Sequence, residues 1–249
     1  MDTCCKKKEV IIQLEGISFS YPGSSQPVLD KLNLKLYRGD RMGVVAPNGC
    51  GKTTLFNIIM GLFPTDNGSI EIFGQPVQSQ KDFEMVRQKV GLLFQDSDDQ
   101  LFSPTVLEDV AFGPLNLGYS PSEAKAMAIQ TLQDLGLSGY ENRITHRLSG
   151  GEKRMVALAT ILSMQPEVLL LDEPNTGLDE KTKARLVRIL NKLDLSYIVI
   201  SHENDFLYET TTSIFTMENG KMFPGEKIHR HHHEHPHIHH HGGEPSTLH

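Results

Sequence analysis

Apolar and polar residues alternate along two segments near the start of the chain, as in strands that bury one face. The first covers residues 10–21 and the second covers residues 32–37. A third apolar segment, residues 41–45, runs directly into a glycine-rich loop, and residues 52–60 then have the spacing of a helix. This part of the chain therefore predicts strands, then a loop and a helix.

Short apolar runs bounded by polar residues recur farther along the chain, at 92–94, 168–171 and 197–200. Strands that are buried on both faces of a parallel sheet have this continuous apolar character. A segment with leucines on one helical face, residues 184–193, separates the last two runs. Strands that alternate with helices predict an α/β fold with a parallel sheet.

The segment between residues 96 and 165 is helical in character and interrupts this alternation. Ser120-Pro121-Ser122-Glu123 combines a capping box with proline at the first helical position, and it opens a predicted helix over residues 123–135. We therefore expect a helical subdomain, residues 96–165, inserted into a core that is formed by residues 1–95 and 166–225.

The last segment, residues 226–249, has the composition of a disordered, metal-binding tail. Nine of the thirteen residues from 229 to 241 are histidine, and imidazole is a good ligand for nickel, cobalt, copper and zinc. An expression tag is the alternative interpretation, but other residues interrupt the run and eight residues follow it, which favours a native segment. The candidate metal ligands are His229, His231, His232, His233, His235, His237, His239, His240 and His241.

Composition and charge exclude several classes of protein. The chain has 249 residues and a net charge of −7 at pH 7, whereas nucleic-acid-binding domains are usually basic. No apolar run approaches the length of about 20 residues that a membrane-spanning helix needs, and the first residues do not resemble a secretory signal. Three cysteines provide no disulfide framework, which fits a reducing compartment. We expect a soluble cytoplasmic protein with no nucleic-acid partner.

The glycine-rich loop, residues 46–54, has the sequence Ala-Pro-Asn-Gly-Cys-Gly-Lys-Thr-Thr and lies between a strand and a helix, as a P-loop requires. Backbone N–H groups of such a loop surround the phosphates, Lys52 reaches the β- and γ-phosphate oxygens, and the Thr53 hydroxyl binds Mg²⁺. Ala46 replaces the first glycine of the pattern, which is compatible with binding if its φ stays negative. The candidate nucleotide-binding residues are Asn48, Gly49, Cys50, Gly51, Lys52, Thr53 and Thr54.

The apolar run at 168–171 ends in two carboxylates, Asp172 and Glu173. Asp172 at the strand tip suits Mg²⁺, while Glu173 points elsewhere and can accept a proton from an attacking water. Alone, such a pair is typical of a turn with solvated acids. In a chain with a P-loop, the pair favours a metal site and a catalytic base.

Residues 148–152, Leu-Ser-Gly-Gly-Glu, precede a basic, helix-forming run and constitute a second candidate phosphate site. Ser149, Gly150 and Gly151 lie where backbone N–H groups are exposed at a helix N-terminus and the helix dipole favours an anion. Two phosphate sites in one chain imply that two chains share each nucleotide.

Together these segments resemble the nucleotide-binding subunit of ABC transporters, and the resemblance covers residues 9–225. It implies a P-loop NTPase (RecA-like) core with a parallel sheet, an antiparallel β subdomain and an inserted α-helical subdomain. Four further residues match elements of that family in order: Tyr21, the aromatic that stacks on adenine; Gln95, which touches Mg²⁺ and the attacking water; Asp179, in the loop that links the two sites of the dimer; and His202, which contacts the γ-phosphate and orients the base.

The resemblance implies hydrolysis of ATP, with Mg²⁺, at two composite sites of a dimer. A complete motif set in one chain favours a homodimer over a heterodimer of two ATPases. In each site Lys52, Thr53, Gln95, Asp172, Glu173 and His202 of one chain would face Ser149 and Gly151 of the other. Closure of the dimer would bring the Ser149 hydroxyl and the Gly151 N–H onto the γ-phosphate.

The loop after Gln95, residues 96–114, is similar to that of the ATPases of energy-coupling-factor (ECF) importers, which take up vitamins, cobalt or nickel. The resemblance implies a transmembrane subunit and a substrate-binding component as partners, and a place at the cytoplasmic face of the membrane. With the histidine-rich tail, it narrows the expected substrate to nickel or cobalt. A vitamin importer, or another ABC importer with an incidental tail, is the alternative.

Proteins of other classes explain the sequence less well. A nickel-insertion GTPase would combine a P-loop with histidines, and residues 191–194, Asn-Lys-Leu-Asp, fit the guanine-specifying pattern. That pattern belongs at the end of a buried strand, whereas here it is predicted to end a helix. An ABC-type ATPase without a membrane partner would carry coiled coils or a second cassette, and a metal-storage protein would not need Glu173.

Overall fold

The computed structural model describes residues 8–24 and 26–225, so the predicted histidine-rich segment lies outside the described residues. One of its two sheets is antiparallel, with the strand order β2-β1-β4-β5. Its strands are β1 (Val10–Phe19), β2 (Leu29–Tyr37), β4 (Asn67–Ile72) and β5 (Gln75–Pro76). Buried and less buried residues alternate along β2, which confirms the prediction of a strand that buries one face.

The second sheet has the order β10-β9-β3-β8-β7-β6, and all its neighbouring strands are parallel except β9 and β10. Every residue of the three strands predicted from continuous apolar runs, β6, β7 and β8, is buried. The six strands are β3 (Arg41–Val45), β6 (Val90–Leu93), β7 (Val168–Asp172), β8 (Ser196–Ile200), β9 (Ser213–Glu218) and β10 (Lys221–Pro224).

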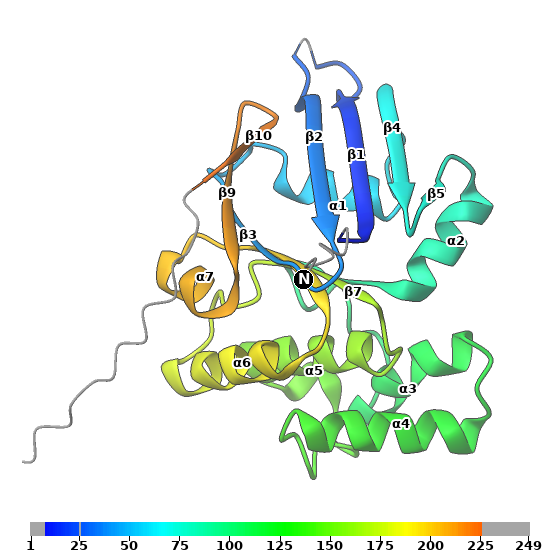
Figure 1. Ribbon diagram of the computed structural model, residues 1–249. Helices are drawn as coiled ribbons and strands as arrows, with labels where there is room; N and C mark the ends of the chain where they lie inside the picture. The colour runs from blue at the N-terminus through cyan, green and yellow to red at the C-terminus, as the bar shows by residue number, and fades with distance from the viewer. Residues whose placement is uncertain (1–7, 25, 226–249) are drawn as a thin grey trace, which may run out of the picture.

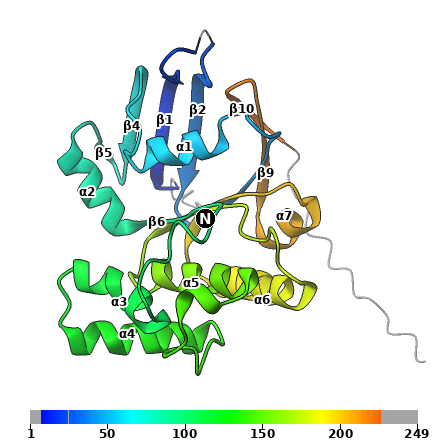
Figure 2. The same cartoon turned by 180° about the vertical axis from the view of Figure 1, so that it is seen from behind.

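The helices form two groups (Figures 1 and 2). α1 and α2 lie beside the antiparallel sheet, whereas α3, α4 and α5 pack on one another at the opposite end, with α6 alongside α5. In chain order the helices are α1 (Lys52–Ile59), α2 (Gln80–Lys89), α3 (Val106–Asn116), α4 (Pro121–Asp134), the 3₁₀ turn η1 (Thr145–Arg147), α5 (Gly150–Leu162), α6 (Glu180–Lys192) and α7 (Asn204–Thr210). In the part of the chain that the structure describes, no helix is long and apolar enough to cross a membrane.

The parallel sheet separates two hydrophobic cores. Leu170 of β7 belongs to the core shared with α1 and the antiparallel sheet, whereas Leu169 and Leu171 belong to the core shared with the helices at the other end. Successive residues of a strand face opposite sides of its sheet, so a continuous apolar run serves both cores. Both faces of β7 are therefore packed against apolar side chains.

Helix α5 packs closely on β6 at Gly91. A Cβ atom added to Gly91 would overlap the Cγ2 atom of Ile161. Because both residues are buried, we expect Gly91→Ala to lower the free energy of unfolding by about 1–3 kcal/mol through overpacking. Urea unfolding of the variant measures this loss.

The double variant Gly91→Ala/Ile161→Ala provides the control. Truncation of Ile161 frees the space that the new methyl group needs, so the double variant should be more stable than the sum of the two single losses predicts. Strict additivity of the two losses would show that the overlap is relieved elsewhere.

Candidate functional site

Four neighbouring strands of the parallel sheet, in the order β3-β8-β7-β6, end at one edge of the molecule. The P-loop follows β3, His202 follows β8, Glu173 follows β7 and Gln95 follows β6. In open α/β sheets, ligands bind outside the carboxyl ends of the strands. The topology therefore gathers residues that are far apart in the sequence around one cleft.

The P-loop needs two of its glycines for their backbone conformation. Gly49 and Gly51 have φ values of 79° and 99°, and a Cβ atom on Gly51 would lie 2.8 Å from the Leu29 side chain. Ala46 keeps a negative φ, so its methyl group causes no strain. No side chain caps the N-terminus of α1 at Gly51, which leaves the first N–H groups of the helix available to an anion.

The ammonium group of Lys52 lies between Glu173 and His202 and is almost fully buried. Its Nζ atom is 3.2 Å from the Ala46 carbonyl oxygen, 3.4 Å from Asn48 Oδ1, 3.0 Å from His202 Nε2 and 3.4 Å from Glu173 Oε1. The structure thus brings together the P-loop and the residues after β7 and β8 around one positive charge. A phosphate group is a suitable additional partner for this charge.

Asp172 and Thr53 meet beside the lysine. The Thr53 hydroxyl donates to Asp172 Oδ2 at 2.8 Å, while Asp172 Oδ1 is buried with no hydrogen-bond partner within the described residues. Burial raises the pKa of Asp172, and the bond from Thr53 opposes this. An unpaired buried carboxylate oxygen next to a hydroxyl is a donor set that suits Mg²⁺.

Glu173 has a backbone conformation that its residue type rarely adopts, with φ of 51°. Its N–H donates to the Ile200 carbonyl oxygen at 3.0 Å, which fixes this turn against the end of β8. Glu173 Oε1 lies 2.9 Å from His202 Nε2, and Oε2 accepts a bond of 3.3 Å from the Thr176 hydroxyl. Strained backbone of this kind persists where the surrounding structure fixes it, and it aims this carboxylate at His202.

Gln95 is exposed in the loop after β6 and lines a cavity of about 640 Å³ together with Thr53 and Gly150. Sequence reasoning missed Arg154, which lines the same cavity. Its guanidinium donates to the Phe94 carbonyl oxygen at 2.9 Å and so ties α5 to the residue before Gln95. Burial lowers the pKa of Arg154, opposed by nearby carboxylates. The only signal in the sequence was a basic residue at the start of an apolar helical run.

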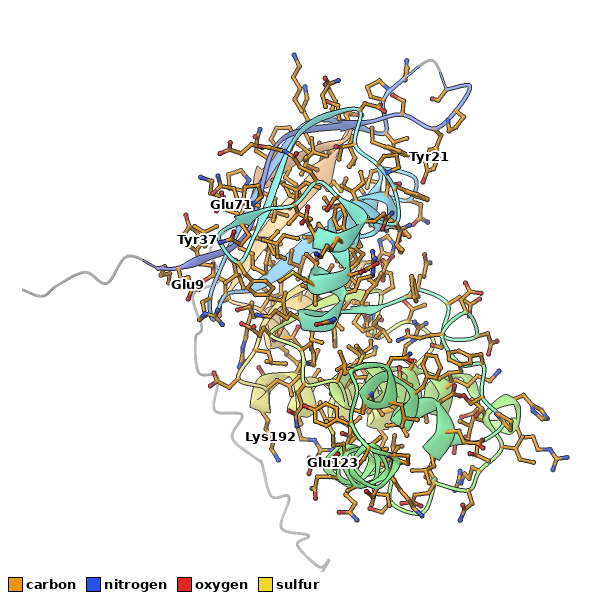
Figure 3. The ribbon with its side chains drawn as sticks, turned by 90° about the vertical axis from the view of Figure 1, so that its right-hand side faces the viewer. Glu9, Tyr21, Tyr37, Glu71, Glu123 and Lys192 are labelled. Atoms are coloured by element: carbon orange, nitrogen blue, oxygen red, sulfur yellow. The ribbon has the colours of Figure 1, made fainter. Side chains whose placement is uncertain are left out.

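Tyr21 is exposed at the end of β1, at the edge of the molecule opposite Glu9 (Figure 3). Its hydroxyl is 2.9 Å from Thr54 Oγ1, and its ring lies edge-on to Phe19 and Phe63. The structure thus places the predicted adenine-stacking residue beside the P-loop. It also shows that the Thr54 hydroxyl faces this tyrosine.

The Ser-Gly-Gly turn is held by a capping box at the start of α5. Ser149 Oγ accepts a bond from the Glu152 N–H at 3.3 Å, and Glu152 Oε2 accepts one from the Ser149 N–H at 2.9 Å. Bonds from Ser149, Tyr140 and Arg143 lower the pKa of Glu152 to about 2. The N–H groups of Gly150, the first helical residue, and of Gly151 are then left without an intrahelical partner.

Asp179 lies beside this turn, not beside Lys52. It caps α6 by accepting a bond from the Thr182 N–H at 2.9 Å, and it lines a cavity of about 510 Å³ with Ser149 and Gly151. Among the residues that the structure describes, no hydrogen bond or ion pair joins the Ser-Gly-Gly turn to Lys52 or Glu173. One chain therefore presents two candidate phosphate sites that no hydrogen bond joins within the described residues, although Gly150 lines the same cavity as Thr53.

Comparison with known proteins agrees with this arrangement. The family model described as ABC transporter matches residues 29–176, more than half of the chain. A Nitratidesulfovibrio vulgaris protein that carries the name of an ABC transporter ATP-binding protein is 49% identical over 239 residues, 96% of this chain and 86% of the relative. The energy-coupling factor transporter ATP-binding protein EcfA of Methanothermobacter thermautotrophicus is 44% identical over 216 residues, 85% of this chain and 69% of the relative.

Solved structures resemble the whole cassette. CbiO1 from Clostridium perfringens, described as part of the ABC transporter complex cbiONQ, superposes with a TM-score of 0.78 at 31% identity, covering 87% of this chain and 88% of that one. A bacterial ABC transporter cassette described as dimeric gives a TM-score of 0.81 at 25% identity, covering 89% and 100%. The chain belongs to the ABC transporter family of ATP-binding subunits, which hydrolyse ATP, and it has the P-loop NTPase fold of their cassettes.

Proposed function

We propose that the chain is the ATP-hydrolysing subunit of an ECF-type importer for nickel or cobalt, attached to the cytoplasmic face of the membrane. The EcfA relatives and the match to CbiO1 support the ECF class. The observation that carries the choice of substrate is the segment with nine histidines in thirteen residues, whose imidazoles suit both metals. A vitamin importer with an incidental tail is the competing proposal.

The alignment with the Nitratidesulfovibrio vulgaris relative supports a native origin of this segment. It covers 239 of the 249 residues, which leaves about ten unaligned, fewer than the 24 residues from 226 to 249. The alignment therefore extends into the histidine-rich segment. A tag added for expression would not align with a natural protein in this way.

In the proposed nucleotide site, the P-loop N–H groups and Lys52 bind the phosphates of ATP. Thr53, Asp172 and Gln95 would hold Mg²⁺, which when bound supplies neutralisation of the phosphate charge. Glu173 takes a proton from the attacking water, and His202, at 2.9 Å, orients that carboxylate. Tyr21 stacks on adenine.

The second half of each site comes from a second copy of the chain. The Ser149 hydroxyl proton has no acceptor within the described residues, and the N–H groups of Gly150 and Gly151 lack intrahelical partners. These donors suit a γ-phosphate that the partner presents. Phosphoryl transfer depends mainly on such positioning and electrostatic stabilisation, so closure of the homodimer completes the catalytic site.

The transmembrane subunit docks, in this proposal, on an apolar groove of about 270 Å³ between β6, α3 and α5. Phe102 and Phe112 are 66% and 44% exposed at its rim, with their rings edge to face, and such exposed apolar groups mark interaction sites. Asp109 lines the groove, and its Oδ2 is buried and unpaired within the described residues. Phe94 and Gln100 line the groove on either side of Gln95 in the chain, so membrane contact and nucleotide contact share one segment.

The geometry does not support the GTPase hypothesis. Asn191 and Lys192 end helix α6, as predicted, and do not follow a buried strand. The Asn191 side chain is engaged in the fold, where it accepts a bond from Arg41 and donates one to the Glu209 carbonyl oxygen at 3.0 Å. These bonds account for the asparagine without a guanine base.

Metal uptake into membrane vesicles tests the proposal. The vesicles contain the chain with its membrane partners, and the uptake of ⁶³Ni²⁺ or ⁵⁷Co²⁺ is measured. We expect uptake that requires ATP and that falls to background without this chain. Uptake of a labelled vitamin, with no metal uptake, would instead support the competing proposal.

A variant that ends at residue 225 tests the histidine-rich segment in the same vesicles. If the tail supplies metal, truncation should lower uptake at limiting metal and leave it unchanged at excess metal. Replacing the nine histidines with asparagine at constant length is the matched control, because it separates imidazole chemistry from chain length. Unchanged uptake in both regimes would remove the tail from transport.

A further inference from the structure

We infer that Asn175 is a positioning residue that holds His202 in register with Glu173 through a buried bridge to Ser201. The inference rests on the proposed roles of Glu173 and His202. It assigns a function to Asn175, a residue in the loop after β7 that lies outside the P-loop, the candidate metal site and the Ser-Gly-Gly turn.

The bridge is buried and geometrically well defined. Asn175 and Ser201 are 1% and 0% exposed. The Ser201 hydroxyl donates to Asn175 Oδ1 at 2.9 Å, and its oxygen accepts the Glu203 N–H at 3.1 Å. The bonds of Ser201 therefore fix the backbone on both sides of His202.

The histidine itself has little else to hold it. Its side chain is 48% exposed, and its polar contacts within the described residues are with Glu173 and Lys52, both members of the catalytic cleft. When a phosphate group draws Lys52 away, the orientation of the ring depends on the short loop after β8. Ser201 sets that loop, and Asn175 holds Ser201.

Asn175 also connects this loop to the segment that ends at Asp179. Its carbonyl oxygen accepts the Leu178 N–H at 3.3 Å, and Thr176, the next residue, donates its hydroxyl to Glu173. A movement of residues 176–179 on dimer closure would therefore reach Ser201 through one buried amide. Buried hydrogen-bonded pairs transmit position well because leaving either partner unpaired is costly.

The test compares the ATP hydrolysis rates of the Asn175→Ala and Ser201→Ala variants of the full chain with that of the wild type, all measured in the same assembly. We expect each variant to lower kcat about tenfold to a hundredfold, since small displacements of catalytic groups have effects of this size. KM for MgATP should change less than threefold, because neither residue touches the nucleotide in the proposed site. The double variant should lose no more than the larger single loss.

Ser163→Ala is the matched control. Ser163 is 1% exposed and donates a buried hydrogen bond of 2.8 Å to the Val110 carbonyl oxygen, far along α5 from the cleft. The Ser163→Ala variant should lose about as much thermal stability as the bridge variants and keep the wild-type kcat. If the single bridge variants do not fold, Asn175→Leu/Ser201→Ala removes both polar partners of the bridge, leaves only the Glu203 N–H without its acceptor, and gives the same comparison.

Glu173→Gln, measured in parallel, separates the role of the base from the role of the bridge. If Glu173→Gln is inactive and the bridge variants keep the wild-type kcat, the proposed base stands and the role of Asn175 is overturned. If Glu173→Gln itself turns over ATP at the wild-type rate, the proposed function of that residue has failed instead. A loss of kcat in Ser163→Ala equal to that of the bridge variants would reduce the bridge to a stabilising contact.

Discussion

Replacing Glu173 with glutamine should leave ATP bound and slow its hydrolysis by a factor of about 10² to 10⁴, the usual contribution of a general base. The amide keeps the size of the side chain and its bond from Thr176, but it cannot take a proton from water. In the proposed site, binding depends on Lys52 and the P-loop, which the substitution leaves in place. Nucleotide titration and single-turnover hydrolysis measure the two effects separately.

Glu167→Gln is the matched control for this substitution. Glu167 precedes the same strand, β7, and its carboxylate forms ion pairs with Arg38 and Lys89 at the other end of the sheet. The control removes one negative charge from the same strand without touching the cleft, so its turnover should equal that of the wild type. Turnover of Glu173→Gln within a few-fold of wild type would remove Glu173 from the role of base.

Gly151→Asp should abolish most ATP turnover while the variant chain still folds and binds ATP. A Cβ atom at Gly151 meets only the Leu178 side chain, at 3.5 Å, so the substitution fits the single chain. In the proposed dimer its carboxylate would face the γ-phosphate of the partner, and charge repulsion would push that phosphate away from the N–H donors of the turn. Loss of one such donor alone costs about 10² to 10³ in rate.

Asn142→Asp places the same charge on an exposed turn of the helical region and serves as the control. Both variants are compared by ATP affinity, by the monomer–dimer equilibrium with ATP, and by turnover. Only Gly151→Asp should lose ATP-dependent dimerisation. If it dimerises and hydrolyses ATP normally, the Ser-Gly-Gly turn does not meet the nucleotide.

The sequence predicted most elements whose signal is local. The runs at 168–171 and 197–200 became β7 and β8, and the capping box at Ser120 opens α4 with Pro121 as its first residue. The helix begins two residues before the predicted start, since capping residues precede the apolar pattern. The antiparallel sheet was predicted from the family resemblance and not from the periodicity. Its strand β5 has only two residues, Gln75 and Pro76, and depends on pairing with β4.

The sequence identifies the residues of the site, but it does not reveal most of the contacts between them. The motifs located Lys52, Asp172 and Glu173, because P-loops and strand-end carboxylates have local patterns. Nothing local indicates that Glu173 has a positive φ, since neighbouring strands impose that turn. The bonds of Arg154 to Phe94 and of Asn175 to Ser201 join segments 60 and 26 residues apart, and such pairs require the fold.

The bond from Arg154 to the Phe94 carbonyl oxygen has a thermodynamic consequence for the dimer. In the proposed dimer, it would join the helix that faces the partner's nucleotide to the loop that contacts the chain's own nucleotide. Occupancy of one site would then alter the affinity of the other, and the same coupling free energy must act in the reverse direction. The two nucleotides of such a dimer would bind cooperatively, although each contacts a different P-loop.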